Sequence, residues 1–392
     1  MTDTINIAIV GGGVIGCAVA LELSGRYEDV FLFEKNSGIT QGENQSSRNS
    51  GVIHSGIYYD QETRPEKAAL CVEGNSLLYE FCEMHRVPAL KTGKLIVATN
   101  TDEEEVLDLY LERARENGVP EVARIIGAEV FNLEPNVSAK SALIVPTAGI
   151  VDPTSLVHRF HTLASQSGVQ FMIDTEITGF EDDGEYIHMD IRYRDGRMDH
   201  VLARVVINAG GVDADLLAAA FNPDSPYELD PISGESYKFY GHKRPELKVN
   251  GMNIYPTPEV VHTPHGKHFT VGVHLTPTFE DISYPPELGS TVTIGPKLIS
   301  LKDRQDLSGP SFDPKIFADK ARSYFPGLRE GDLIWHQMGI QARLKNYPDF
   351  IISADSERPN FINLLGIDSP GLTSCLAIAR RSRKMVDRLR SE

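Results

Sequence analysis

Apolar residues near the start of the chain form two short runs on either side of a glycine-rich turn. Residues 5–10 are almost all apolar, residues 17–23 are mostly apolar, and a second run, Val30–Phe33, ends on Glu34. The glycines in the turn are Gly11, Gly13 and Gly16. This pattern predicts a buried strand, a tight turn, a helix, and a second strand that ends in an acidic residue.

These elements in this order are typical of a site for the ADP half of a dinucleotide. The glycines permit the turn and let the backbone approach a pyrophosphate, and the helix N-terminus offers unpaired N–H groups to the phosphates. Glu34 lies 18 residues after Gly16, where it can accept from a ribose hydroxyl, and its charge disfavours the 2′-phosphate of NADP. The pattern alone fits FAD or NAD. The residues expected to contact the dinucleotide are Gly11, Gly13, Val14, Ile15, Gly16, Glu34 and Lys35.

A second glycine-rich strand end lies far along the chain. The apolar run 201–207 is followed by Asn208, Ala209, Gly210 and Gly211. It predicts a discontinuous dinucleotide-binding domain made of residues 1–88, 148–218 and 330–392. Residues 89–147 and 219–329 then form a substrate domain. Most prolines lie in its later part, with short β-like runs at 271–275 and 291–294, which predicts a mainly antiparallel sheet.

Other periodic segments predict the remaining elements. Helices are expected over residues 65–85 and 102–117, from Pro153 behind an Asp152 cap, and after Pro370, and strands over residues 94–99, 169–173, 187–193 and 361–365. The fold class expected from all of these is α/β, with an α+β second domain.

Composition narrows the class of protein. The chain has 38 basic and 55 acidic residues, a net charge of −17, which argues against a nucleic-acid partner. No apolar run approaches the roughly 20 residues of a membrane-spanning helix, and the N-terminus enters the first strand at once, without room for a signal peptide. The four cysteines form no CxxC pair. A cytoplasmic enzyme without structural disulfides is therefore expected.

Several motifs, spread in order over nearly the whole chain, resemble those of L-2-hydroxyglutarate dehydrogenases and oxidases. This family belongs to the FAD-dependent D-amino-acid-oxidase-like superfamily. The matching segments are residues 47–59 (SRNSGVIHSGIYY), 67–74 (KAALCVEG), 93–98 (GKLIVA), 148–154 (AGIVDPT), 272–276 (GVHLT) and 294–296 (IGP).

The resemblance implies FAD rather than NAD, and a Rossmann-type FAD domain that carries a large β-sheet substrate domain. It implies oxidation of an L-2-hydroxy acid, most of all L-2-hydroxyglutarate to 2-oxoglutarate, by hydride transfer to flavin N5. Oxygen or a quinone would take the electrons. Glycerol-3-phosphate oxidases and amine or amino-acid oxidases share this fold and stay as alternatives, as does a non-catalytic accessory flavoprotein.

The chain departs from the family at two positions that often hold arginine. Ser233 precedes Gly234-Glu235, and Gln341 lies in the segment Gly339-Ile340-Gln341-Ala342-Arg343. A dicarboxylate substrate needs cations, so these neutral residues keep the alternative substrates open.

Histidine is the natural base near neutral pH, and His54, in the segment that resembles the flavin-contacting loop, is the first candidate. His274 is the second. Further flavin contacts are expected from Ser46, Ser47, Arg48, Ser50 and Gly51, from Ala209 and Gly210, and from Gly371, Leu372 and Thr373 at a helix N-terminus. Candidates for the substrate pocket are Tyr58, Tyr255, Lys297 and Arg343.

Two further patterns carry weaker hypotheses. His262, His265 and His268 do not share one helix face and have no carboxylate or cysteine beside them, so no metal site is expected. The last helix is rich in basic residues, which is typical of a solvated helix C-terminus. The alternative interpretation is weak peripheral contact of these residues with the inner face of a membrane.

Overall fold

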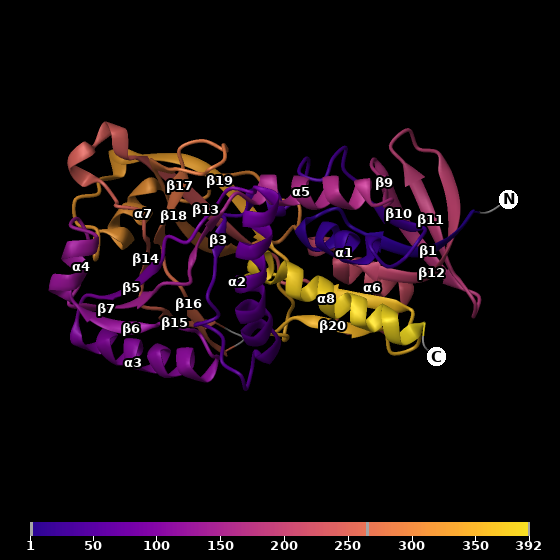
Figure 1. The fold of residues 1–392 in the computed structure, drawn as a ribbon, viewed down its shortest axis with the longest axis horizontal. Helices are drawn as coiled ribbons and strands as arrows, with labels where there is room; N and C mark the ends of the chain where they lie inside the picture. The colour runs from indigo at the N-terminus through magenta and orange to yellow at the C-terminus, as the bar shows by residue number, and fades with distance from the viewer. Residues whose placement is uncertain (1–2, 264–265, 391–392) are drawn as a thin grey trace.

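The computed structural model describes residues 3–263 and 266–390, and for residues 3 and 259–270 the backbone alone. The chain forms two parts that lie side by side along the long axis of the molecule, with helix α2 (Pro65–His85) between them (Figure 1). Each part is built on an eight-stranded sheet. The predicted α/β fold with a second sheet-based part is therefore confirmed.

The first sheet brings the two glycine-rich strand ends together. Its strands are β1 (Asp3–Val10), β2 (Val30–Phe33), β9 (Gln170–Met172), β10 (Thr175–Asp182), β11 (Ile187–Tyr193), β12 (Met198–Asn208), β20 (Ile351–Ala354) and β21 (Phe361–Leu365). The neighbours β9, β2, β1, β12 and β21 run parallel, and β10, β11 and β20 pair antiparallel. Val10 of β1 lies opposite Asn208 of β12, so both glycine-rich turns leave the same edge of the sheet.

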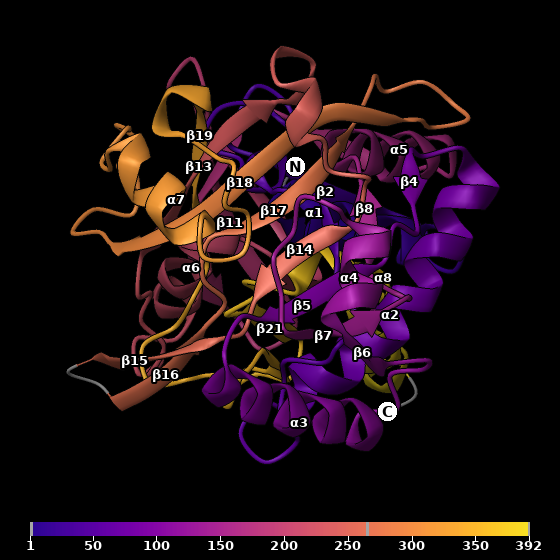
Figure 2. The ribbon, with the colours of Figure 1, turned by 90° about the vertical axis from the view of Figure 1, so that its left-hand side faces the viewer.

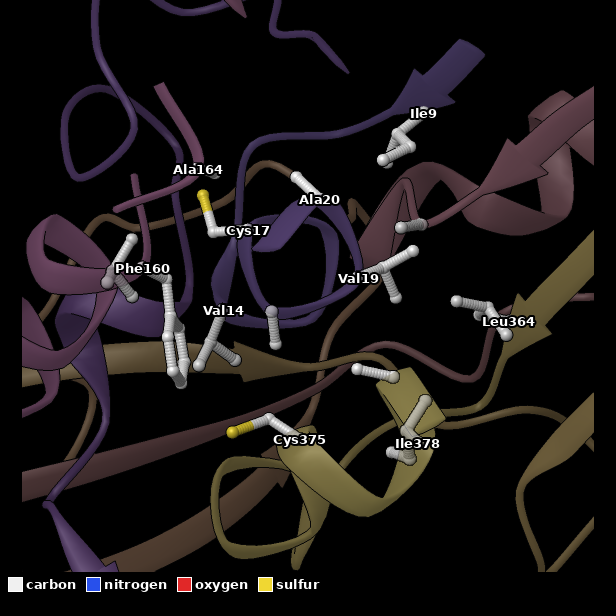
Figure 3. Packing of buried hydrophobic residues seen from close by; sticks show 14 of the residues in the cluster. Ile9, Val14, Cys17, Val19, Ala20, Phe160, Ala164, Leu364, Cys375 and Ile378 are labelled. Carbon is white, nitrogen blue, oxygen red and sulfur yellow. The ribbon is translucent and has the colours of Figure 1, made fainter. Parts of the chain in front are cut away.

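Helices cover one face of this sheet. They are α1 (Val14–Ser24), α5 (Pro153–Gln166) and α8 (Gly371–Leu389), and α2 packs against α8. Figure 3 shows Cys17 of α1, Phe160 of α5 and Cys375 of α8 in the buried layer between them. The Asp152 carboxylate accepts from Ser155 N at 2.7 Å, which confirms the predicted cap of α5. Helix α6 (Ala214–Phe221) packs on the other face, beside β10.

The second sheet is mainly antiparallel, as predicted. In spatial order it contains β19 (Leu333–Gln341), β13 (Ile232–Tyr240), β18 (Leu288–Ser300), β17 (His274–Phe279), β14 (Asn253–Pro256), β5 (Lys94–Ala98), β7 (Ser141–Val145) and β6 (Ala123–Ile126). Only the β14–β5 pair is parallel among the strand pairs of the described chain in this sheet.

Alternating side chains give this sheet two different faces. Leu95, Ile254 and Leu275 point to an outer core that includes residues of α4 (Gly127–Leu133) and α7 (Pro314–Ala321), the side turned to the viewer in Figure 2. Ile96 and Tyr255 point to the opposite face, into a core shared with α2 and with α3 (Thr101–Glu116). This inner face of the second sheet is turned toward the first part of the molecule. Polar side chains on this face therefore lie between the two parts.

Smaller elements complete the chain. A three-stranded sheet joins β3 (Val52–Ile53), β8 (Gly149–Val151) and β4 (Ala89–Leu90), and β15 (Glu259–Thr263) pairs with β16 (Gly266–Thr270). The short 3-10 turns are η1 (Ser46–Arg48), η2 (Gly211–Asp213), η3 (Gly241–Lys243), η4 (Pro245–Leu247) and η5 (Glu330–Asp332).

One predicted boundary is wrong. Strand β19 pairs with β13 in the second sheet, so residues 333–341 do not lie with the dinucleotide-binding sheet, where the predicted division had placed them. The physical reason is that a strand joins a sheet through its pairing partner, which can be far away in sequence. The remaining boundaries stay predictions.

Candidate active site

The turn after β1 is shaped for close contact with its surroundings. Gly11 has φ +111°, and a Cβ there would lie 2.4 Å from the Ala209 carbonyl oxygen. A Cβ on Gly16 would lie 1.9 Å from the Gly11 carbonyl oxygen. Both positions therefore require glycine, as the dinucleotide pattern predicts. Val14 and Ile15 follow in the first turn of α1.

Glu34 lies directly against this turn. Its carboxylate accepts from the Gly12 N–H at 2.7 Å and from the Asn36 N–H at 2.7 Å, and the residue is buried. The carboxylate is thus held at the end of β2, where a ribose would bind. The Lys35 side chain is not directed at the ribose position, because its ammonium pairs with Glu43 at 2.7 Å and Asp213 at 2.8 Å. The pair with Asp213 joins the end of β2 to the η2 turn.

The polar loop before β3 lies over the N-terminus of α1. Ser46 Oγ accepts from the Val14 N–H at 2.9 Å, and Ser47 Oγ donates to the Asn44 carbonyl at 3.0 Å. Arg48 Nε is buried and has no partner among the described residues. Ser50 is exposed, and Gly51 has φ +77°. The loop therefore places hydroxyls and one guanidinium beside the predicted pyrophosphate position.

The end of β12 completes this edge of the sheet. Ala209 N donates to the Val10 carbonyl at 2.9 Å, and Gly210 N donates to Asn208 Oδ1 at 3.2 Å. The glycine cradle, the acidic residue and the buried, unpartnered Arg48 Nε fit the ADP half of a dinucleotide such as FAD.

The N-terminus of α8 meets the His54 segment. Gly371, Leu372 and Thr373 are buried in its first turn, and Thr373 Oγ1 accepts from the His54 N–H at 3.0 Å. Ser374 Oγ is buried without a partner among the described residues. The Gly371 N–H donates to the Asp368 carbonyl at 2.6 Å. The positive dipole end of this long helix lies at the histidine segment.

His54 is held from several sides. Its carbonyl accepts from Asn75 Nδ2 at 2.8 Å, and its Nε2 lies 3.4 Å from Ser369 Oγ, which is itself 3.5 Å from Tyr59 Oη. Its Nδ1 is buried and has no partner among the described residues. Burial, with smaller contributions from Lys94 and His274, lowers the pKa of His54 well below its usual range, so the ring is neutral.

His274 lies in the same cluster. Its ring stacks on Tyr255 with the centroids 3.8 Å apart, and its Nδ1 lies 3.0 Å from the Gly272 carbonyl. Burial is the main cause that lowers the pKa of His274 to about 3, and the charge of Lys94 adds to it. Tyr58 stacks on Tyr255 at 6.2 Å. The structure therefore brings together four predicted site residues: His54, His274, Tyr58 and Tyr255.

Two predicted pocket residues show no such contact. Lys297 Nζ lies 5.7 Å from the centroid of Phe312, and Arg343 faces Asp230 at 3.9 Å. In the described part of the chain, no hydrogen bond, ion pair or ring contact joins either residue to His54 or His274. Their role in the pocket stays a prediction.

Sequence reasoning missed two members of the cluster. Lys94, at the start of β5, lies over the rings of Tyr255 and Tyr58, at 3.7 and 5.1 Å from their centroids. Ser369, in the turn before α8, bridges His54 and Tyr59. A lysine inside an otherwise apolar strand was the available signal for Lys94, because lysine is rarely buried.

The two neutral positions that often hold arginine do not share one surface. Gln341 pairs with Ile232, and Ser233 pairs with Ile340, on adjacent strands β19 and β13. Because neighbouring residues of a strand point to opposite faces, Gln341 and Ser233 lie on opposite sides of the sheet.

No group of three potential metal-ligating side chains occurs within the residues whose side chains the structure describes. The side chains of His262, His265 and His268 lie outside those residues. On α8, Arg383 pairs with Glu22 at 2.7 Å, Arg380 faces Glu73 at 3.8 Å, and Arg381 pairs with Glu66. Of the helices in the described ranges, none is long and apolar enough to span a bilayer.

The dinucleotide cradle lies on the first large sheet, and of the two neutral histidines His54 follows β3 and His274 begins β17 of the second large sheet. This arrangement fits a two-part dinucleotide-dependent redox enzyme. The family described as FAD dependent oxidoreductase matches residues 6–384. The chain belongs to this family, and it is an FAD-dependent oxidoreductase.

Individual relatives cover nearly the whole chain. A mitochondrial L-2-hydroxyglutarate dehydrogenase of Arabidopsis thaliana is 31% identical over 96% of this chain and 82% of its own length. An L-2-hydroxyglutarate dehydrogenase of Indibacter alkaliphilus is 29% identical over 95% and 96%. A glycerol 3-phosphate dehydrogenase of Caloramator mitchellensis is 30% identical over 95% and 72%.

A solved structure shows the same fold with its cofactor. It is the dithionite-reduced L-alpha-glycerophosphate oxidase of Mycoplasma pneumoniae with FAD bound, 26% identical, with a TM-score of 0.85 over 98% of this chain and 95% of that one.

Proposed function

We propose that this enzyme oxidises the CH–OH group of an L-2-hydroxy acid, with L-2-hydroxyglutarate as substrate and 2-oxoglutarate as product. The observation that carries the proposal is the neutral His54 bonded to the N-terminus of α8, with the neutral His274 within electrostatic range of it. The similarity to the Arabidopsis and Indibacter dehydrogenases supports the choice of substrate.

His54 serves as the base. Its ring is neutral and lies at the N-terminus of α8, so it can accept the proton of the substrate hydroxyl. FAD, when bound, supplies the acceptor for the α-hydrogen, which leaves as hydride to flavin N5. With FAD bound, the positive dipole end of α8 would stabilise the negative charge that reduction of the flavin creates.

The charge of a protonated His274 would act on His54, and the His274 ring stacks on Tyr255 in the same group of buried side chains. It orients the substrate, and His54 takes the proton. The electrons pass on to oxygen or a quinone. The chain's own acidic surface and the ion pairs of α8 support an enzyme with at most weak peripheral membrane contact, in the cytoplasm.

Glycerol 3-phosphate is the second candidate substrate. The Caloramator relative and the Mycoplasma structure favour it, at identities close to those of the hydroxyglutarate enzymes. Neutral residues at Ser233 and Gln341 weaken the case for a dicarboxylate, because carboxylates are best held by arginine.

An anaerobic substrate panel tests the proposal. The purified holoenzyme is mixed with L-2-hydroxyglutarate, D-2-hydroxyglutarate or glycerol 3-phosphate, and the flavin absorbance is recorded. Rapid bleaching by the L-enantiomer alone supports the proposal, and the D-enantiomer is the matched control. Bleaching by glycerol 3-phosphate alone would replace it with the second candidate. An FAD spectrum that no donor bleaches, amino acids included, would indicate an accessory flavoprotein.

A further inference from the structure

Lys94 is a fully buried lysine without an acidic partner. Its relative exposure is 0%, and Nζ has no hydrogen-bond partner among the described residues. No carboxylate in the described part of the chain lies within ion-pair distance of Nζ. Lysine is almost never buried without a partner, so this position needs a physical explanation.

Aromatic rings surround the ammonium group. Nζ lies 3.7 Å from the centroid of Tyr255 and 5.1 Å from that of Tyr58, and these rings lie within 22° of parallel. The His274 ring lies 3.8 Å from the same Tyr255 centroid, at 18° to its plane. An ammonium and a ring this close to one centroid would collide on one face. Lys94 and His274 therefore occupy opposite faces of Tyr255.

The strand neighbours of Lys94 suit a cation rather than an anion. Asn253 lies in register with Lys94, and its Nδ2 donates to Gly93 O and Gly149 O, which fixes Oδ1 as the free acceptor. Thr276 Oγ1, on the next strand, is also buried without a partner among the described residues. Oxygen acceptors and ring faces both stabilise an ammonium, and Oδ1 would repel a bound carboxylate.

The charge of Lys94 acts on both histidines. It lowers the pKa of His54 and of His274, in each case after the larger effect of burial. Burial lowers the pKa of Lys94 itself to about 7, so Lys94 is cationic throughout the acidic range in which a histidine would take up a proton.

Most of the other titratable groups around the cluster are neutral or paired. Burial raises the pKa of Tyr58, Tyr59, Tyr110, Tyr255, Tyr324 and Cys71, which keeps them neutral. Of the nearby charged groups, Lys67 pairs with Asp368 at 2.7 Å and Arg64 with Asp60 at 3.1 Å. Arg113 lies 5.2 Å from the centroid of Tyr110 and is a further cation at the far side of the cluster.

We propose that Lys94 is a positioning residue of the active site: its buried charge lies across the Tyr255 ring from His274, in the cluster that also holds His54, and adds to burial in keeping both histidines unprotonated and able to accept a proton. This inference rests on the proposed role of the histidines, but not on the identity of the substrate.

The test is a histidine titration by NMR on the oxidised holoenzyme, without substrate, with His54→Asn and His274→Asn used to assign the signals. In Lys94→Met the proton affinity of both histidines should rise about tenfold or more. The reason is that a unit charge separated from an imidazole by one aromatic ring still acts on it through an effective dielectric constant of about 20. Lys94→Arg should keep the wild-type values. Lys91→Met, an exposed lysine three positions away, is the matched control and should change nothing.

A kinetic readout accompanies the titration. The rate of flavin reduction by whichever donor bleaches the enzyme should show an acid limb at higher pH in Lys94→Met than in the wild type or Lys91→Met, because removing the cation lets the histidines protonate earlier. A purely structural lysine would change the rate without moving this limb.

Two results would overturn the proposal. One is a folded, FAD-containing Lys94→Met enzyme in which both histidine signals titrate as in the wild type. The other needs no variant at Lys94: a wild-type holoenzyme whose His54 and His274 titrate near the ordinary value of 6.5 does not keep them neutral. A failure of L-2-hydroxyglutarate to bleach the flavin would affect neither measurement.

Discussion

The backbone N–H of His54 donates to Thr373 Oγ1 at 3.0 Å, across 319 positions of sequence. This bond joins the segment that carries the base to the first turn of α8. Thr373 is fully buried, and α2 crosses closely here, since a Cβ on Gly74 would lie 2.4 Å from the Thr373 carbonyl oxygen. The Thr373 side chain is thus one of the contacts that fix the base relative to the helix dipole.

Thr373→Val should therefore destabilise the folded enzyme and make the position of His54 less fixed. It removes the acceptor and leaves a buried N–H unpaired, at a cost of about 1–3 kcal/mol in the free energy of unfolding. Urea unfolding with FAD fluorescence measures the loss. Thr373→Ser keeps the hydroxyl and should retain most of the stability. Equal stability of the valine and serine variants would show that the bond contributes nothing.

His54→Gln should slow flavin reduction about 10²- to 10⁴-fold, the usual contribution of a general base, while FAD stays bound. His274→Asn should have a smaller effect, because His274 orients the substrate. Rapid-reaction absorbance of the oxidised flavin gives both rates. A His54→Gln enzyme with its full reduction rate would remove His54 from the role of base.

The glycine cradle allows a matched comparison. Gly16→Ala should lose FAD and stability, because its Cβ would lie 1.9 Å from the Gly11 carbonyl oxygen. Gly25→Ala, at the end of the same helix, meets nothing within 4 Å and should keep both. FAD content from the absorbance spectrum and the melting temperature are the measurements. A Gly16→Ala protein with full FAD content would contradict the close approach of helix and strand.

Local patterns made the dinucleotide site predictable. One short stretch of the chain contains the glycines, the helix that starts at Val14, and Glu34. Their spacing alone therefore predicts the turn. His54 and the α8 turn could be named because their segments resemble a known family. Lys35 could be placed beside Glu34, but its ion pair to Asp213 depends on a strand far along the chain.

Contacts between distant strands made the rest unpredictable. The sequence around Lys94 predicts an apolar strand. The position of Lys94 over Tyr255 results from the pairing of β5 with β14, which the sequence does not reveal. β19 was assigned to the wrong sheet for the same reason, because its partner β13 lies about a hundred positions earlier. Sequence spacing carries no information on such pairings.

His274 makes the stability of the fold depend on pH. Its pKa is 6.5 in an ordinary environment and about 3 in the folded chain. Between these values the unfolded chain binds a proton that the folded chain does not, so stability is fully present above pH 6.5 and is lost as the pH falls toward 3. Urea unfolding at pH 5 and pH 7 should show a smaller difference in His274→Asn than in the wild type. An equal difference would assign the pH dependence to other groups.

The most direct measurement of the central claim is the anaerobic reduction of the flavin by L-2-hydroxyglutarate and by its C2-deuterated form. The proposed reaction predicts rapid bleaching by both, slower with deuterium because the C2–H bond breaks in the hydride step, and 2-oxoglutarate in amounts equal to the flavin reduced. Admitting air afterwards then shows whether oxygen takes the electrons. A flavin that stays oxidised with either form would contradict the assignment of L-2-hydroxyglutarate as the substrate.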